Sequence, residues 1–142
     1  MMFASSKLIR TFRAVSGKPT GTKPDTGEPV FDYSQAGQKQ AAKGPIPAGL
    51  YWVRPDEIWE NAWYKRGSTT SWGNYRLTIH PFDTTQTHGR GGFFLHGGSN
   101  PGSIGCIDLT ADIDRFMQDL RREVGTNTVC QIHLTVDYRM WK

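Results

Sequence analysis

Frequent glycine and proline residues divide this chain into short segments, and that division limits the folds it can adopt. The 142 residues include 16 glycines and 8 prolines, many of them in turn-like runs such as 44–49 and 89–92. Between these runs lie short segments that alternate between apolar and polar residues, a pattern typical of β-strands. The length suits a single domain, residues 1–142, with one hydrophobic core. The sequence therefore predicts a mainly β fold.

The same patterns predict the positions of most elements. Strands are expected at residues 7–15, 50–53, 75–80, 93–95 and 129–138. The polar stretch 17–44 predicts a long loop, and a loop of that length in a compact domain usually has a function or moves. Residues 55–64 favour a short helix with Pro55 in its first turn, and residues 67–73 predict a second loop.

One helix is predicted in more detail, beginning at Thr110 as its N-cap and ending at Gly125. Its apolar face comprises Ile113, Phe116, Met117, Leu120 and Val124. The last strand alternates, so that Cys130 falls on its apolar face and is expected in the core. The expected architecture is a mostly antiparallel β domain with this one late helix packed on it.

Composition excludes several classes of function. The net charge is +4, but Lys and Arg are scattered and no aromatic RNA-binding motif is present, so we expect no nucleic acid partner. No run approaches about 18 apolar residues, so no membrane insertion is expected. The first residues lack the apolar core of a secretory signal, and we therefore expect synthesis in the cytoplasm without a signal peptide. Two cysteines are too few for a disulfide framework.

The residues capable of chemistry are concentrated in the stretch 93–109, FFLHGGSNPGSIGCIDL. An apolar strand ends at His96, a loop of small residues follows, and Cys106 lies just before the predicted helix. A neighbouring histidine can take the proton of a thiol and make it a nucleophile. Backbone N–H groups left open by glycines can hold the oxyanion of a tetrahedral intermediate, which contributes about 3 kcal/mol per donor. A free cysteine is more often a small buried hydrophobe, but a loop rich in Gly, Ser and Pro is not core filling.

These residues carry a family resemblance. His96-Gly97 followed by Ser103-Ile104-Gly105-Cys106 resembles the L,D-transpeptidase signature, in which an HG pair precedes a serine-x-glycine-cysteine element. The short separation and the run 102–109 look closer to the Tlde1 branch, the L,D-transpeptidase-like effectors that type VI secretion delivers. The turn 45–49 before a Tyr-Trp strand also looks like that branch. The resemblance covers most of the chain loosely and residues 93–109 tightly.

The resemblance implies an L,D-transpeptidase-like antiparallel β domain with Cys106 as nucleophile, His96 as its base and no cofactor. The implied substrates are peptidoglycan stem peptides, cut between meso-diaminopimelate and D-alanine. The resulting thioester would pass either to water, as in an L,D-carboxypeptidase, or to an amine such as a D-amino acid, as in an L,D-transpeptidase. The resemblance also implies action in the periplasm of a target bacterium after secretion, and an immunity protein as a partner that covers the site.

Two departures from the family pattern affect the substrate contacts. The family has a second histidine before the glycine-cysteine pair, where this chain has Ile104, and an arginine two positions after the cysteine, where it has Asp108. Substrate carboxylate contacts therefore cannot be transferred, and Arg90 and Arg76 are the candidate replacements. Asp108 is interpreted first as a structural carboxylate at the helix entry. The candidates for oxyanion and substrate binding are Gly97, Ser103, Ile104, Gly105 and Arg90.

Other interpretations remain open beside this one. His80, His88 and His96 recur at equal spacing but lack any HExxH or paired CxxC motif, so no metal site is predicted. The aromatic residues Trp52, Trp59, Trp63, Tyr64 and Trp72 either fill the core, which is favoured, or rim a groove. A cysteine peptidase or amidase acting on peptidoglycan is an alternative, although His96 precedes Cys106, the reverse of the papain-like order. A non-catalytic cell-wall-binding module is the alternative outside the enzymes.

Overall fold

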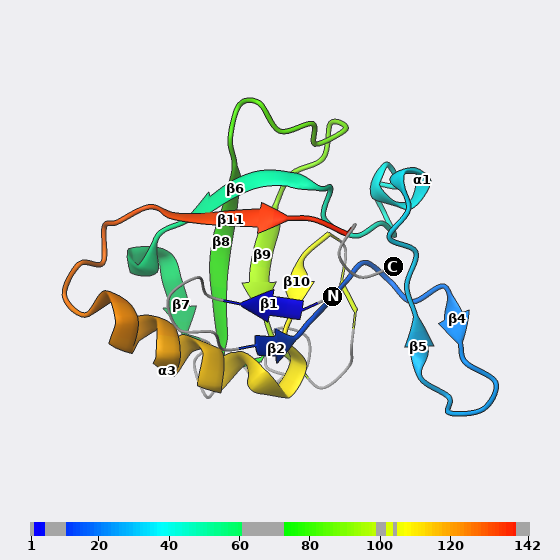
Figure 1. Ribbon diagram of the computed structural model, residues 1–142, viewed down its shortest axis with the longest axis horizontal. Helices are drawn as coiled ribbons and strands as arrows, with labels where there is room; N and C mark the ends of the chain where they lie inside the picture. Colours follow the sequence, from blue (N-terminus) through cyan, green and yellow to red (C-terminus); the bar gives the residue numbers. More distant parts are fainter. Residues whose placement is uncertain (1, 5–10, 61–72, 99–101, 104, 139–142) are drawn as a thin grey trace.

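A curled, seven-stranded sheet forms the body of the protein (Figure 1). The computed structural model describes residues 2–4, 11–60, 73–98, 102–103 and 105–138. The sheet contains β3 (Val15–Ser16), β6 (Gly49–Val53), β7 (Ile58–Glu60), β8 (Tyr75–Pro81), β9 (Phe93–His96), β10 (Ile107–Asp108) and β11 (Ile132–Val136). The strand order is β11-β6-β8-β9-β10-β3, with β7 paired to β8. The prediction of a mainly β fold is therefore confirmed.

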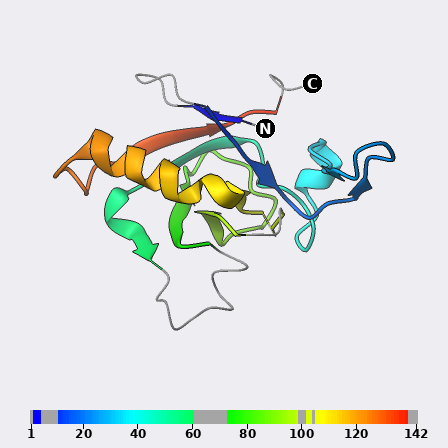
Figure 2. The ribbon, with the colours of Figure 1, turned by 90° about the horizontal axis from the view of Figure 1, so that it is seen from below.

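Smaller elements surround this sheet. Two-stranded pairs are formed by β1 (Met2–Ala4) with β2 (Thr11–Arg13), and by β4 (Gly21–Thr22) with β5 (Pro29–Val30). The helical elements are α1 (Gln35–Gln38), α3 (Ile113–Val124) and the 3-10 turns η1 (Pro55–Glu57) and η2 (Thr110–Asp112). Figure 2 shows α3 lying along one side of the body, while α1 and the β4–β5 hairpin project at one end. In the part of the chain that is described, no helix is long and apolar enough to cross a membrane.

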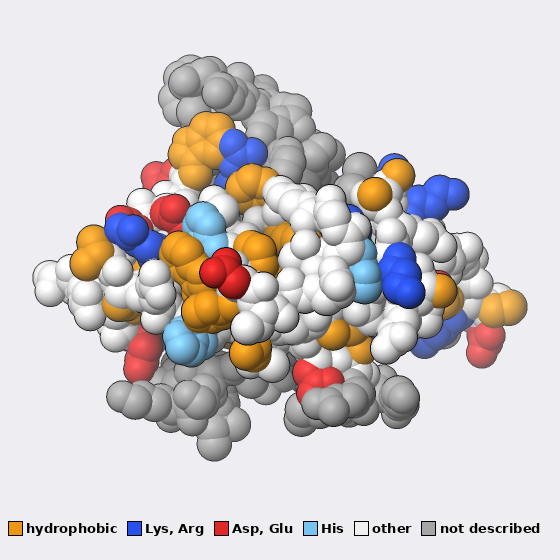
Figure 3. Space-filling model, turned by 90° about the horizontal axis from the view of Figure 1, so that it is seen from above, with side chains coloured by type: hydrophobic (Ala, Val, Ile, Leu, Met, Phe, Trp, Pro, Cys, Tyr) orange, Lys and Arg blue, Asp and Glu red, His pale blue; other side chains and the backbone are white. Residues whose placement is uncertain are grey.

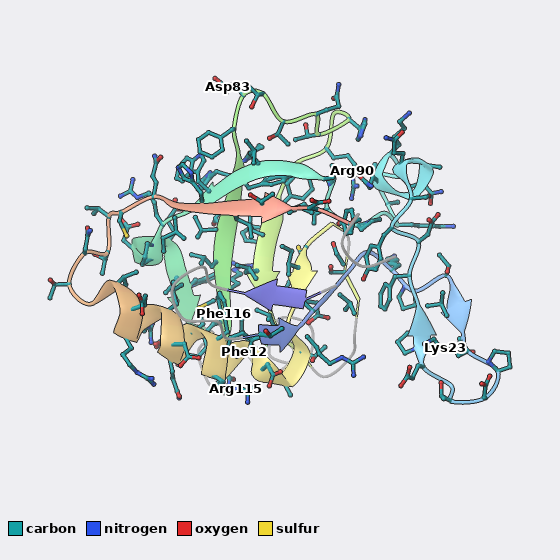
Figure 4. The ribbon with its side chains drawn as sticks, in the orientation of Figure 1. Phe12, Lys23, Asp83, Arg90, Arg115 and Phe116 are labelled. Atoms are coloured by element: carbon teal, nitrogen blue, oxygen red, sulfur yellow. The ribbon has the colours of Figure 1, made fainter. Side chains whose placement is uncertain are left out.

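The core lies between the sheet and α3. Strands β8 and β9 pair with Leu77 opposite Leu95 and Ile79 opposite Phe93, and all four side chains are buried. The helix contributes Ile113, Phe116 and Met117 to the same core, as its periodicity predicts. Phe12 of β2 packs edge to face on Phe116 at 5.6 Å between ring centroids (Figure 4), so β2 also covers this core.

Strands β9 and β10 are parallel neighbours, whereas the other paired strands of the sheet are antiparallel. Leu95 pairs with Ile107 and His96 with Asp108. Arg76 of β8 lies opposite His96 on the other side of β9. Because side chains alternate along a strand, His96, Asp108 and Arg76 share one face of the sheet, while Leu77, Leu95 and Ile107 share the other.

The helix predicted for residues 55–64 is wrong in its described part. Only η1 is helical, and Ile58–Glu60 then turns into β7 and pairs with β8. Hydrogen bonding to the open edge of β8 outweighs the helical pattern, and residues 61–64 lie outside the described residues. The predicted loop at 67–73 also lies outside them apart from Gly73.

The predicted loop 17–44 contains regular structure. It forms the β4–β5 hairpin, in which Lys23 and Glu28 are paired at 3.5 Å, and the single turn of α1. Ser34 caps that turn by accepting a hydrogen bond from the Gly37 N–H at 3.1 Å. The polar composition of this stretch suits short exposed elements as well as a loop, so composition alone did not reveal them.

Two side-chain predictions are also corrected. Cys130 precedes β11 and is only half-buried, and its thiol donates to the Asn127 carbonyl at 3.1 Å instead of filling the core. Trp59 is 47% exposed with the Arg76 guanidinium 3.6 Å above its ring, and Trp52 stacks on His80 at 4.1 Å. Figure 3 shows hydrophobic and histidine side chains gathered on the face seen from above. The described tryptophans therefore lie at the surface, and Trp63, Tyr64 and Trp72 lie outside the described residues.

Candidate active site

His96 ends β9 and is almost completely buried, at 2% exposure. Its Nδ1 atom lies 2.7 Å from the Gly97 carbonyl oxygen. A carbonyl oxygen only accepts hydrogen bonds, so in the neutral imidazole Nδ1 carries the proton. The other ring nitrogen, Nε2, is then the basic one. The backbone thus orients His96 as a proton acceptor through Nε2.

Cys106 immediately precedes β10 and is 5% exposed. Burial raises the pKa of its thiol to about 11, and the negative charge of Asp108 acts in the same direction. The Phe94 backbone N–H and the positive charges of Arg76 and Arg90 act in the opposite direction but do not cancel the effect of burial. At neutral pH the resting thiol is therefore protonated, and it needs a base to become a nucleophile.

The parallel pairing of β9 and β10 brings the histidine and cysteine segments together. Asp108 pairs with His96, and Cys106 immediately precedes this two-residue strand. His96 and Cys106 therefore lie on neighbouring chain segments, and the charges of Asp108 and Arg76, which pair with His96 on either side, both act on the thiol.

Asp108 is fully buried, with an exposure of 0%. Its Oδ2 accepts a hydrogen bond from the Gly102 N–H at 2.9 Å, and its Oδ1 accepts one from the Thr110 N–H at 2.8 Å. Oδ1 also lies 3.9 Å from His96 Nδ1. The predicted role at the helix entry is present, but the helix cap itself differs: Thr110 has φ 52° and its hydroxyl donates to the Leu109 carbonyl. Burial raises the pKa of the Asp108 carboxyl.

The loop before Cys106 is fastened at several points. The Ser103 hydroxyl donates to the Cys106 carbonyl at 2.9 Å, and the Ser103 N–H donates to the Gly17 carbonyl at 2.8 Å. Since the N–H groups of Gly102 and Ser103 are both used within the protein, neither is available to an oxyanion. Ile104 lies outside the described residues.

Gly97 and Gly105 stand where a side chain would collide with its surroundings. A Cβ atom on Gly97 would lie 2.4 Å from Ile113 Cγ2 and 2.5 Å from the Thr110 carbonyl oxygen. Gly105 has φ +78°, and its Cβ would lie 2.7 Å from Arg90 Nη2. The glycines therefore let the start of α3 and the Arg90 guanidinium approach the backbone on either side of the His96 and Cys106 segments.

Arg90, a candidate for substrate binding, holds a neighbouring loop. Its Nη1 donates to the carbonyl oxygens of Gln38 and Pro45, each at 2.6 Å, and its Nη2 donates to that of Gly44 at 2.9 Å. Figure 4 shows Arg90 beside α1. The same guanidinium lies against Gly105, so Arg90 links the loop 38–45 to the segment that carries Cys106.

A hollow of about 350 Å³ lies beside this loop. Lys18, Lys43 and Asp32 contribute charged side chains to its lining. Pro19, which lines the hollow, also lies against the loop before Cys106, 2.9 Å from where a Cβ on Gly102 would be. Within the described residues, no group of three or more His, Cys, Asp or Glu side chains is arranged to hold a metal ion.

Two features of the site were missed by sequence reasoning. His96 is oriented by the backbone carbonyl of Gly97, and the direction of a backbone carbonyl cannot be read from the residue type. The position of Asp108 beside His96 depends on the parallel pairing of two short strands, one of which, β10, was not predicted at all. A two-residue strand leaves no periodic signal in a sequence.

The protein thus combines a mainly β fold with a buried histidine and a buried cysteine on neighbouring chain segments. Residues 28–131 match the model of the Tlde1 domain, and because this match covers more than half of the chain, the protein belongs to the Tlde1 domain family. This confirms the branch indicated by residues 93–109. Membership indicates a type VI effector of the L,D-transpeptidase type with a role in peptidoglycan modification. A search of curated proteins gave no significant match.

Proposed function

We propose that the protein is an L,D-carboxypeptidase or L,D-transpeptidase that acts on the tetrapeptide stems of peptidoglycan through Cys106. The observation that carries this proposal is the arrangement of His96. Its Nδ1 is held by the Gly97 carbonyl, which makes Nε2 basic, on a strand that is hydrogen-bonded in parallel to the segment of Cys106.

The chemistry follows from these two side chains. Nε2 of His96 takes the thiol proton of Cys106, and the sulfur attacks the carbonyl carbon between meso-diaminopimelate and D-alanine. The tetrahedral oxyanion collapses, the carbon–nitrogen bond breaks, and the imidazolium returns the proton to the leaving D-alanine amine. Water then hydrolyses the thioester to a carboxylate, or an amine converts it to a new amide. Either route regenerates the thiol.

The engaged N–H groups narrow the choice of oxyanion donors. The N–H groups of Gly102 and Ser103 donate within the protein. We therefore assign the binding of the oxyanion to the backbone N–H groups around Gly105 and Cys106. Arg90 acts on this backbone by lying against Gly105, and its three hydrogen bonds to carbonyl oxygens make it a brace for the site. The hollow lined by Lys18 and Lys43 offers positive charge to the carboxylates of a stem peptide.

Because the pKa of the Cys106 thiol is high, its alkylation rate does not distinguish an enzyme from a wall-binding module. Slow alkylation of Cys106 at neutral pH is expected of both, because the buried thiol is protonated in the resting protein. Formation of an acyl-enzyme is the distinguishing property. Intact-protein mass spectrometry after an acid quench should show a mass increase equal to the acyl part of a muropeptide.

The test is incubation of the purified protein with tetrapeptide muropeptides, with and without a free D-amino acid. Release of D-alanine with a tripeptide product would support the carboxypeptidase, and replacement of the terminal D-alanine would support exchange. Cleavage at another bond would favour the cysteine peptidase or amidase. Binding to sacculi without any change in muropeptide mass, by a folded protein, would contradict the enzyme and favour the wall-binding module.

A further inference from the structure

Asp108 is a charged residue next to His96 and Cys106, and it takes no part in the proposed reaction steps. Its carboxylate is fully buried and accepts hydrogen bonds from the loop, at Gly102, and from the helix entry, at Thr110. These two contacts lie on either side of the Cys106 segment. The carboxylate therefore ties together the two backbone segments that fix the position of the thiol.

The structure offers a comparison that shows what a capping role alone requires. Asp32 makes the same local turn, with its Oδ1 accepting from the Ser34 N–H at 3.0 Å, and it does so at an exposed position. A turn of this kind can equally be made by Asn or Ser, which carry no charge to desolvate. Burying a carboxylate for the sake of one such turn is costly unless another group responds to its charge.

His96 is the group that can respond. Its Nδ1 lies 3.9 Å from Asp108 Oδ1, which is too long for a hydrogen bond but close for two charges. The Nδ1 proton is directed at the Gly97 carbonyl instead, so orientation and charge come from different groups. When His96 accepts the Cys106 proton, the resulting imidazolium stands next to a buried anion.

We propose that Asp108 is a positioning residue that acts through His96, by holding the segments around Cys106 in place and by favouring the imidazolium formed when the thiol proton is transferred. This inference rests on the proposed role of His96 as the base. The Asp108 carboxylate lies 3.9 Å from the imidazole, and its charge also acts on the Cys106 thiol. The proposal requires that its attraction for the imidazolium exceed its repulsion of the thiolate. The other charges that act on the thiol are those of Arg76 and Arg90.

The test measures the rate of Cys106 alkylation by iodoacetamide at pH 7, in a Cys130→Ala background so that only one thiol reacts. Asp108→Asn is made both with His96 present and with His96→Gln. With His96 present, the substitution should slow alkylation about threefold or more, because the imidazolium–thiolate pair loses its support. With Gln at position 96, the same substitution should accelerate alkylation, because only the repulsion between Asp108 and the thiolate is removed.

The reversal of sign is the diagnostic result, since a purely structural role would change both rates in the same direction and would overturn the proposal. Asp83→Asn, which neutralises a carboxylate in an exposed turn outside the proposed site, is the control and should change neither rate. If Asp108→Asn does not fold, as judged by circular dichroism, Asp108→Ser retains a side-chain acceptor for Thr110 and makes the same test. No wall substrate is needed, so a protein that shows the reversal but leaves muropeptides unchanged would contradict the proposed function and not this inference.

Discussion

Cys106 and Cys130 illustrate how differently the same side chain behaves in two settings. Cys106 is buried beside a histidine, an aspartate and the positive field of two arginines, whereas Cys130 is half-buried and donates to a turn carbonyl. Because the pKa of the Cys106 thiol is raised, the resting protein holds it as a protonated thiol and not as a nucleophilic thiolate. In the proposed mechanism, the nucleophilic thiolate forms only when a substrate is bound and His96 removes the proton.

Replacing each cysteine should separate these roles. Cys106→Ala should lower muropeptide turnover by at least about 10³-fold, because it removes the proposed nucleophile. Cys130→Ala should leave turnover unchanged and alter the free energy of unfolding by less than about 1 kcal/mol. Turnover measured by chromatography, with thermal unfolding as a check on folding, decides between the two. A folded but inactive Cys130 variant beside an active Cys106 variant would reverse the assignment.

Among the elements, the junction between β9 and the start of α3 is closely packed around Gly97. Gly97→Ala should place a methyl group within 2.5 Å of Ile113 and Thr110, and so displace either the helix or the histidine segment. We expect a loss of about 2 kcal/mol in stability and a large loss of turnover.

Gly91→Ala is the matched control for this substitution. No heavy atom lies within 4 Å of a Cβ at that position, so neither stability nor turnover should change. Thermal unfolding and turnover measured on both variants test the prediction. An unchanged melting temperature for Gly97→Ala would show that the packing at this junction is less restrictive than the distances indicate.

The loop 38–45 should depend on Arg90 in a similar way. Arg90→Met removes all three hydrogen bonds to carbonyl oxygens, and hydrogen bonds from charged donors contribute about 1.5–3 kcal/mol each when they are lost singly. We expect a lower melting temperature and faster proteolysis within residues 38–45. Arg54→Met, which removes a partly exposed pair with Asp56, should have little effect on either measurement. Equal proteolysis of the two variants would contradict the proposal that Arg90 holds the loop 38–45 in place.

The sequence predicted the elements whose patterns are long or strongly periodic. The helix face of Ile113, Phe116 and Met117 and the strands at residues 49–53, 75–81 and 93–96 are present where they were expected. The prediction was wrong where pairing with a distant strand decides the conformation. Residues 58–60 form a strand because β8 offers a partner, and that partner is not visible in the local pattern.

For the site, the sequence identified side chains but not their arrangement. His96 and Cys106 were singled out from residue type and surroundings, and the parallel strands bring their segments together. Gly97 acts through its backbone carbonyl, which points at His96 Nδ1. Asp108 acts through its carboxylate, which the pairing of two strands brings to 3.9 Å from the same atom. Both depend on tertiary structure, which residue spacing does not encode.

At the scale of the whole molecule, the proposed substrate predicts the compartment in which the protein should be toxic. Expression in the cytoplasm of a Gram-negative host should be harmless, whereas fusion to a periplasmic signal should kill cells or make them swell, because donor tetrapeptides are consumed. Growth curves and microscopy measure this effect. Cys106→Ala at equal expression should abolish it, and a co-expressed periplasmic immunity protein that covers the site should suppress it. Killing from the cytoplasm alone would contradict the wall substrate.

The strand β3 packs beside the site but lies outside the region that matches the family model. Ser16 is fully buried, its hydroxyl accepts the Ile46 N–H at 2.8 Å, and it pairs with Ile107 next to Cys106. The matched region begins at residue 28 and ends at residue 131, so it omits both this strand and β11. The region that matches the family model is therefore shorter than the region that packs around the site. A recombinant fragment cut at the edges of the match would retain every proposed catalytic side chain and still lack the wall against which the cysteine segment is built.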